Sequence, residues 1–123
     1  MALYAIGDLH LSFDCEVKSM DFFGSDWKDH EEKVRRNWIR KIKDSDTVVL
    51  TGDHSWGKND VECAADCEFI DARPGRKILL RSNHDMFWEV NKTGRLNEKY
   101  KGRFYFLQNN YYVYDGIALV GTK

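Results

Sequence analysis

Three short apolar runs in this chain each end in a turn that carries metal-ligand side chains. The runs cover Leu3 to Ile6, Thr47 to Leu50 and Lys77 to Leu80, and each is typical of a buried strand entering a turn. The turns that follow are Gly7-Asp8-Leu9-His10, Gly52-Asp53-His54 and Ser82-Asn83-His84-Asp85. Because the carboxyl ends of parallel strands meet along one edge of an open α/β sheet, the three turns are expected to converge in one crevice.

Helical patterns separate these runs. The first pattern has one apolar stripe, made of Trp27, Val34, Trp38 and Ile42. The second covers Val61 to Ala72 and ends at Arg73-Pro74-Gly75, where proline and glycine favour a turn. Strands that alternate with helices favour right-handed βαβ crossovers and therefore a parallel sheet.

The pattern changes after the third turn. Met86 to Tyr100 favours a helix at its start and is interrupted by Asn91, Thr93 and Gly94. Three short strands are then predicted, at Phe104 to Leu107, Tyr111 to Tyr114 and Ile117 to Val120, the last two joined as a hairpin through Asp115-Gly116. The predicted fold class is α/β, with a parallel βαβ sheet followed by short strands and a hairpin. All 123 residues are expected to form one domain.

Composition excludes several classes of partner. Nineteen basic and twenty acidic residues give a formal charge of −1, so no global charge attracts nucleic acid or anionic lipid. Nucleic acid is thus not indicated as a partner, although it stays open as a substrate. No run approaches the roughly 18 apolar residues of a membrane span, and the amino terminus has no signal-peptide layout. With three cysteines, Cys15, Cys63 and Cys67, we expect a cytoplasmic protein with reduced thiols.

The side chains of the three turns suit divalent metals. Asp8 and His10 lie two apart and leave the same face of an extended segment, while Asp53 has two oxygens with which it could bridge two cations. Asn83 offers an amide oxygen to a second cation. Two metals about 3.5–4 Å apart polarise a phosphoryl group and activate a water, which favours hydrolysis of a phosphate ester. His84, oriented by Asp85, could then protonate the leaving alkoxide as a general acid.

At these motifs the chain resembles the calcineurin-like metallophosphoesterase superfamily, whose early motifs run Asp-x-His, Gly-Asp and Gly-Asn-His-Asp. The context, with Met20, Phe23, Gly24, Trp27 and Ser55-Trp56, is similar to a bacterial branch of predicted phosphohydrolases. The resemblance implies two divalent metal ions, of Mn, Fe, Zn or Co. It also implies the residue roles: Asp8 and His10 as ligands of the first metal, Asp53 as the bridge, Asn83 as a ligand of the second metal, His84 as the proton donor and Asp85 as its partner.

The chain departs from that superfamily in its length. The superfamily has a second half that supplies further histidines, whereas this chain ends at Val120-Gly121-Thr122-Lys123. It therefore resembles the amino-terminal half of an α/β sandwich, with an incomplete second metal site and uncertain activity of its own. We expect an exposed apolar face or sheet edge, and hence self-association or a partner that supplies the missing half. Ser82 also replaces the usual glycine, and would store strain if that position needs a positive φ.

Two further interpretations remain open. The chain could be a non-catalytic metal- or phosphate-binding module that pairs with another chain. It could also be an unrelated α/β nucleotide-binding protein, although it lacks the glycine-rich phosphate-binding motifs. The spare histidines His30 and His54 are the candidates for replacing missing ligands. Within the phosphoesterase interpretation, the expected substrates are phosphate mono- or diesters.

Overall fold

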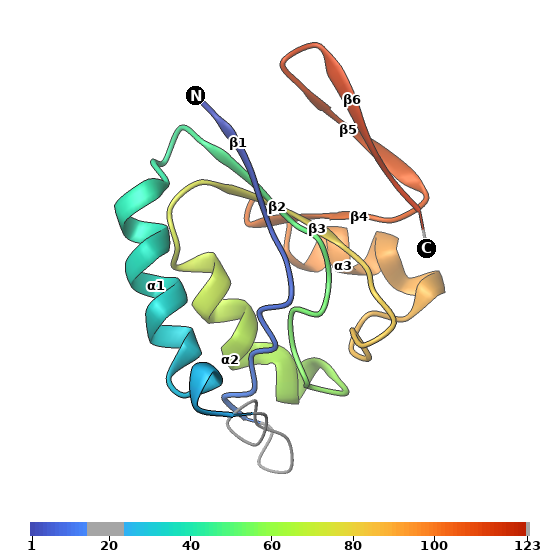
Figure 1. The fold of residues 1–123 in the computed structure, drawn as a ribbon. Coiled ribbons are helices and arrows are strands. Elements are labelled where there is room, and N and C mark those ends of the chain that lie inside the picture. Colours follow the sequence, from blue (N-terminus) through green and yellow to red (C-terminus); the bar gives the residue numbers. More distant parts are fainter. Residues whose placement is uncertain (15–23, 123) are drawn as a thin grey trace.

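A four-stranded parallel sheet forms the centre of the computed structural model, which describes residues 1–14 and 24–122 (Figure 1). Its strands lie side by side in chain order and are β1 (Leu3–Ile6), β2 (Thr47–Leu50), β3 (Arg76–Leu80) and β4 (Phe104–Leu107). The expected α/β class is confirmed. The fourth strand, which the sequence did not assign to a sheet, pairs in parallel with β3. Cys15, Met20 and Phe23 lie outside the described residues.

Helices α1 (His30–Lys41) and α2 (Asp60–Asp71) lie together on one side of the sheet (Figure 1). They bury their apolar side chains against the same face of the strands. The core between helices and sheet includes Trp38, Cys63, Cys67, Ile70, Leu50, Leu79 and Phe106. The two cysteines are therefore core residues. The helix α2 begins at Asp60 because the Asn59 side chain accepts the backbone N–H groups of Val61 and Glu62, at 3.0 Å each.

Two helical expectations are corrected by the structure. Trp27 is outside the first helix, in the 3-10 turn η2 (Ser25–Trp27), because Asp29 adopts a left-handed conformation (φ 53°) that separates the turn from α1. The segment after Asp85 is not helical at its start. Its helical part is at the end, as η3 (Val90–Lys92) and α3 (Thr93–Lys99). The buried Trp88 indole, which donates to Thr93 Oγ1 at 2.8 Å, joins the non-helical start to the first residue of α3.

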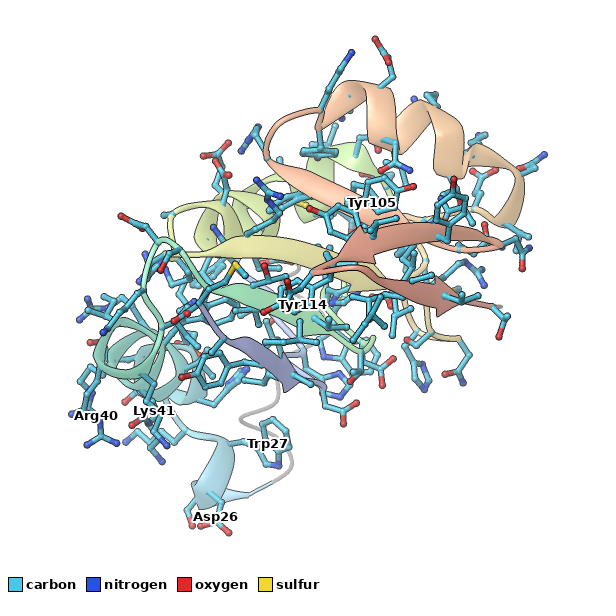
Figure 2. The ribbon with its side chains drawn as sticks, turned by 90° about the horizontal axis from the view of Figure 1, so that it is seen from above. Asp26, Trp27, Arg40, Lys41, Tyr105 and Tyr114 are labelled. Atoms are coloured by element: carbon cyan, nitrogen blue, oxygen red, sulfur yellow. The ribbon has the colours of Figure 1, made fainter. Side chains whose placement is uncertain are left out.

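The hairpin of β5 (Asn110–Tyr114) and β6 (Ile117–Gly121) covers part of the face opposite the helices. Tyr105 of β4 donates to the Tyr111 carbonyl at 2.9 Å, and Arg76 of β3 donates to the Tyr112 hydroxyl at 2.6 Å. Figure 2 shows Tyr105 beside the hairpin strands. These contacts join the hairpin to β3 and β4. The turn is formed by Asp115 and Gly116, both with positive φ, as the sequence predicted.

The other half of that face is less well covered. Leu3 of the edge strand β1 is 43% exposed, and Ala5 is exposed as well. On the hairpin, Tyr111, Val113 and Val120 are each more than half exposed. The described residues thus have an unpaired strand edge at β1 and, on the hairpin, exposed apolar side chains. Such edges and side chains commonly bury against another element or molecule.

The charged side of α1 faces solvent. Arg40 and Lys41 point away from the sheet (Figure 2), and Glu32 pairs with Arg35 at 2.5 Å on the same helix. This arrangement is that of a solvated helix face. Among the described helices, none is long and apolar enough to cross a membrane.

Candidate metal centre

The turns after β1 and β2 are tied together by backbone hydrogen bonds. Asp8 N donates to Gly52 O at 3.1 Å, and His10 N donates to Asp53 O at 2.9 Å. Parallel pairing resumes further on, where Leu11 and Ser55 form a bridge. The ligand-type residues are thus held between two paired regions, and their backbones cannot move independently.

Asp8, His10 and Asp53 all have left-handed backbones, with φ of 59°, 46° and 53°. Such conformations cost of order 1–3 kcal/mol each in non-glycine residues and cluster at functional sites. The sequence interpretation placed Asp8 and His10 on one face of an extended segment, and that geometry is wrong. The turn brings the two side chains together through left-handed backbone instead.

These three residues form a group that could hold a metal ion. One ligand atom from each lies within 4.8 Å of the others. His10 Nε2 is 3.8 Å from Asp8 Oδ1 and 3.9 Å from Asp53 Oδ2. The Asp8 side chain is 69% exposed, whereas His10 and Asp53 are 15% and 16% exposed. One imidazole and two carboxylates, open to solvent on the Asp8 side, suit a borderline divalent cation that enters from that side.

Two tryptophans enclose the His10 ring. Trp56 stacks on it at 5.2 Å between ring centres and 26° between planes, and Trp27 approaches it edge-on at 5.9 Å. Burial lowers the pKa of His10 from its ordinary value, although the negative charges of Asp53 and Asp8 act in the opposite direction. Burial thus favours the neutral imidazole, which is the form that binds metal.

Ser82 holds the Asp53 carboxylate. Its hydroxyl is hydrogen bonded to Asp53 Oδ1, and Asp53 N donates back to Ser82 Oγ at 2.9 Å. Burial acts to raise the pKa of Asp53, but the hydrogen bond with Ser82 and the nearby imidazoles of His10 and His84 act in the opposite direction, and the pKa lies below its ordinary value. Gly52 makes this approach possible, because a Cβ there would lie 2.7 Å from Ser82 Cβ. Ser82 is not among the described residues with positive φ, so the condition under which it would store strain is not met.

Asp85 is buried, at 1% exposure, and its contacts differ from those expected of a partner for His84. Its carboxylate accepts three backbone N–H groups, from Asp53 at 3.0 Å, His54 at 2.7 Å and Ser82 at 3.0 Å. Asp85 therefore fastens the turn after β3 to the turn after β2. In this structure it positions the backbone of Asp53 rather than the ring of His84.

Asn83 and His84 lie on the exposed turn after β3. The His84 ring is 5.8 Å from that of Trp56, on the same side as the Asp8, His10 and Asp53 group, and its charge is one of the influences that lower the pKa of His10. All three turns therefore approach one another, as the sequence predicted. The ligand group itself contains residues from the first two turns.

The spare histidines lie outside the ligand group. His54 is buried, with Nε2 at 2.7 Å from Leu80 O. His30 places Nε2 at 2.7 Å from Leu9 O and Nδ1 at 3.2 Å from Trp27 O. Both rings face backbone carbonyls, so they support the strand-end turns.

The sequence interpretation missed a buried carboxylate beneath the site. Asp66 of α2 is fully buried, accepts Phe13 N at 3.0 Å and is hydrogen bonded to the Ser55 hydroxyl. Burial raises the pKa of Asp66. It connects α2 to both loops that follow the first two ligand turns. The available signal was an acidic residue on the apolar face of the predicted second helix.

Comparisons with known proteins concern the family and the fold of the chain. The chain is similar to the uncharacterized protein MJ1445 of Methanocaldococcus jannaschii, with 28% identity over 87 residues, 71% of this chain and 48% of that protein. It is also similar to a solved structure, the protein of unknown function AQ665 from Aquifex aeolicus, with a TM-score of 0.57 and 25% identity over 96% of this chain and 58% of that one. The chain thus spans about half the length of these relatives. Its whole length, residues 1–123, matches the sequence model of the calcineurin-like phosphoesterases, and the chain belongs to that family.

Proposed function

We propose that this chain is the metal-holding part of a metal-dependent phosphoesterase that hydrolyses phosphate mono- or diesters. The observation that carries the proposal is the group of Asp8, His10 and Asp53, whose ligand atoms lie within 4.8 Å of one another. Their strained backbones are held by hydrogen bonds between two strand ends, so the group is built by the fold. The family consists largely of phosphoesterase hydrolases, which supports this choice of chemistry.

In this proposal Asp8, His10 and Asp53 hold a first divalent ion, and Asp53 and Asn83 contribute to a second. Bound ions would polarise the phosphoryl group and lower the pKa of the attacking water. The chemistry of the donors, one imidazole with carboxylate and amide oxygens, accommodates manganese, iron, zinc or cobalt, and we propose manganese as the first to test. We also propose a cytoplasmic location, in keeping with the reduced state of Cys63 and Cys67, which are free thiols in the core.

His84 is the proposed general acid. It is exposed, so it can reach a substrate, and its ring lies beside Trp56, which stacks on the ligand His10. A proton from the imidazolium would go to the leaving oxygen as the P–O bond breaks. Such assistance contributes about 10²–10⁴ in rate for an alkoxide and matters less for a nitrophenolate, which leaves without a proton.

The test is hydrolysis of bis(4-nitrophenyl) phosphate and of 2-glycerol phosphate with Mn²⁺ present. Asp53→Asn is expected to lower turnover of both by at least about a hundredfold, since a lost ion removes several kcal/mol of transition-state stabilisation. His84→Gln is expected to affect the alkyl ester more than the nitrophenyl ester. Asp44→Asn, an exposed residue in the loop before β2, is the matched control. Turnover that survives Asp53→Asn unchanged would refute the proposal.

A second candidate is a metal-binding module that pairs with another chain, or with a second copy of itself, and has no activity alone. The unpaired edge of β1, with Leu3 exposed on it, and the exposed apolar side chains of Tyr111, Val113 and Val120 on the hairpin favour it. Manganese uptake without turnover would support the module. Turnover by the isolated chain, abolished by Asp53→Asn, would exclude it.

A further inference from the structure

His84, the proposed general acid, is exposed, and its ring is not held by Asp85. The Asp85 carboxylate accepts three backbone N–H groups instead. Within the part of the chain that the structure describes, the His84 imidazole makes no hydrogen bond. Its ring contact is with Trp56, at 5.8 Å between ring centres and 53° between planes. An exposed side chain without such a contact exchanges among several rotamers. The contact with Trp56 is therefore what can restrict the His84 ring.

The loop after β2 holds Trp56 in place. Trp56 N donates to Leu11 O at 2.9 Å. Gly57 N donates to Ser55 Oγ at 3.0 Å. Gly57 also lies against the first turn of α2, because a Cβ there would be 2.6 Å from Cys63 N, closer than a side chain allows. The residues on both sides of Trp56 are thus fixed, and its indole has a rigid base.

Trp56 also contacts the metal group. Its ring stacks on that of His10, at 5.2 Å between ring centres and 26° between planes. One indole therefore touches a proposed ligand from the turn after β1 and the proposed acid from the turn after β3. Fixing an acid relative to the reacting centre removes orientations that cannot react, and this raises the rate of proton transfer.

We propose that Trp56 is a positioning residue for His84, which limits the rotamers of the imidazole and keeps the ring on the side of the Asp8, His10 and Asp53 group. The inference rests on the proposed function, in which His84 gives a proton to the leaving oxygen. Trp56 touches no reacting atom and acts through the position of His84. It thus has the role that the sequence alone suggested for the carboxylate next to His84.

The first measurement is the χ1 rotamer distribution of His84 in the metal-free chain, from vicinal NMR coupling constants. One dominant rotamer is expected in the wild type. Trp56→Leu should give averaged couplings, and Trp56→Phe, which keeps a ring, should preserve more of the dominant rotamer. Trp27→Leu is the matched control, because among the described ring contacts Trp27 meets His10 and His30 and not His84. Averaged couplings in the wild type, or a distribution that both Trp56 variants leave unchanged, overturn the inference.

The second measurement is the ratio of turnover of 2-glycerol phosphate to turnover of bis(4-nitrophenyl) phosphate at saturating Mn²⁺. Both esters use the metal, so an effect on the metal cancels in the ratio, whereas the nitrophenolate leaves without a proton. Trp56→Leu is expected to lower the ratio about two- to tenfold, the equivalent of fixing one side-chain rotamer. In a chain that already carries His84→Gln, the same substitution should leave the ratio unchanged.

An unchanged ratio in Trp56→Leu overturns the inference. An equal decrease with and without His84 also overturns it, because such a decrease does not pass through the acid. Failure of the proposed function looks different. In that case the wild-type chain has no Mn²⁺-dependent turnover, and the rotamer distribution of His84 in the metal-free chain still decides whether Trp56 positions it.

Discussion

Replacing Asp85 by asparagine tests whether this buried residue positions the backbone of the metal centre or the ring of His84. The carboxylate accepts three backbone N–H groups, two on Oδ2 and one on Oδ1. Asparagine keeps nearly the same shape and one oxygen. Its amide can direct that oxygen to the two N–H groups of Asp53 and Ser82, and its NH₂ group then faces the N–H of His54.

The magnitude follows from this arrangement. One hydrogen bond to a charged acceptor is lost, at about 1.5–3 kcal/mol, and a buried donor is left facing another donor. We therefore expect Asp85→Asn to lower the free energy of unfolding by about 2–3 kcal/mol, out of a total of about 5–15 kcal/mol for a domain. Asp85→Ala would leave all three N–H groups without an acceptor and is expected to prevent stable folding. The asparagine variant is thus the informative one.

The assay is urea unfolding in the absence of metal, paired with Mn²⁺ affinity of the folded variant. The backbone of Asp53 loses part of its support, so we expect the first Mn²⁺ to bind roughly tenfold to a hundredfold more weakly, as for other residues that support ligands. The reasoning would be refuted by an unfolding free energy within about 0.5 kcal/mol of wild type. If turnover of an alkyl ester fell while stability held, Asp85 would act on His84, as the sequence alone suggested.

Three further outcomes are expected. Gly52→Ala should lower the unfolding free energy in urea melts by about 2 kcal/mol or more, because Gly52 has a φ of 128° and an added Cβ would lie 2.7 Å from Ser82 Cβ. Gly94→Ala should raise it by up to about 1 kcal/mol, because Gly94 lies on α3 with open space around its Cα. Trp56→Ala should weaken Mn²⁺ binding about two- to tenfold by titration, since it removes the ring stacked on His10; unaltered affinity would contradict this role. Because the pKa of His10 is lowered in the folded chain, the metal-free unfolded chain binds a proton more readily than the folded chain does. The unfolding free energy should therefore decrease as the pH is lowered from about 7.5 to about 5.5, past 6.5, the pKa of His10 in the unfolded chain. A His10→Gln variant should show a weaker dependence of the unfolding free energy on pH over this range. An unchanged dependence would contradict its assignment to His10.

The strand ends could be predicted from the sequence because apolar residues give way there to glycine and polar residues. An apolar run followed by glycine and a carboxylate gave the bounds of β1 and β2 as the structure has them. Convergence of the turns followed from parallel pairing, which alternation of strands and helices predicts. The start of the second helix was predicted to within one residue, since Asn59 is a residue type that favours helix starts, whereas Trp27 was wrongly joined to the first helix because the left-handed backbone of Asp29 has no clear sequence signal.

The sequence could not show how the ligands are held. Aspartate and histidine tolerate left-handed backbone, but they also adopt ordinary conformations, so the residue type does not reveal the positive φ of Asp8 and His10. The acceptor role of Asp85 depends on N–H groups from two other turns, which are distant in sequence from its own. Neighbouring residues such as His84 and Asp85 invite pairing in a sequence, whereas folding directs one outward and the other into the interior.

The apolar surface expected for half of a sandwich is present at β1 and the hairpin, and its occupant stays a prediction. Figure 1 shows the hairpin on the side of the sheet opposite α1 and α2. Light scattering at high protein concentration tests for self-association. A strictly monomeric chain would count against pairing with a second copy.

The left-handed backbone of Asp8, His10 and Asp53 also bears on the thermodynamics of ion binding. Hydrogen bonds between the strand ends fix these conformations. The conformational entropy of the three ligand residues is therefore lost when the chain folds. An ion that binds at the proposed site would not have to order a mobile loop, so little conformational entropy would be subtracted from its affinity. The centre is thus preorganised by the sheet, unlike small metal domains that fold only when the metal arrives.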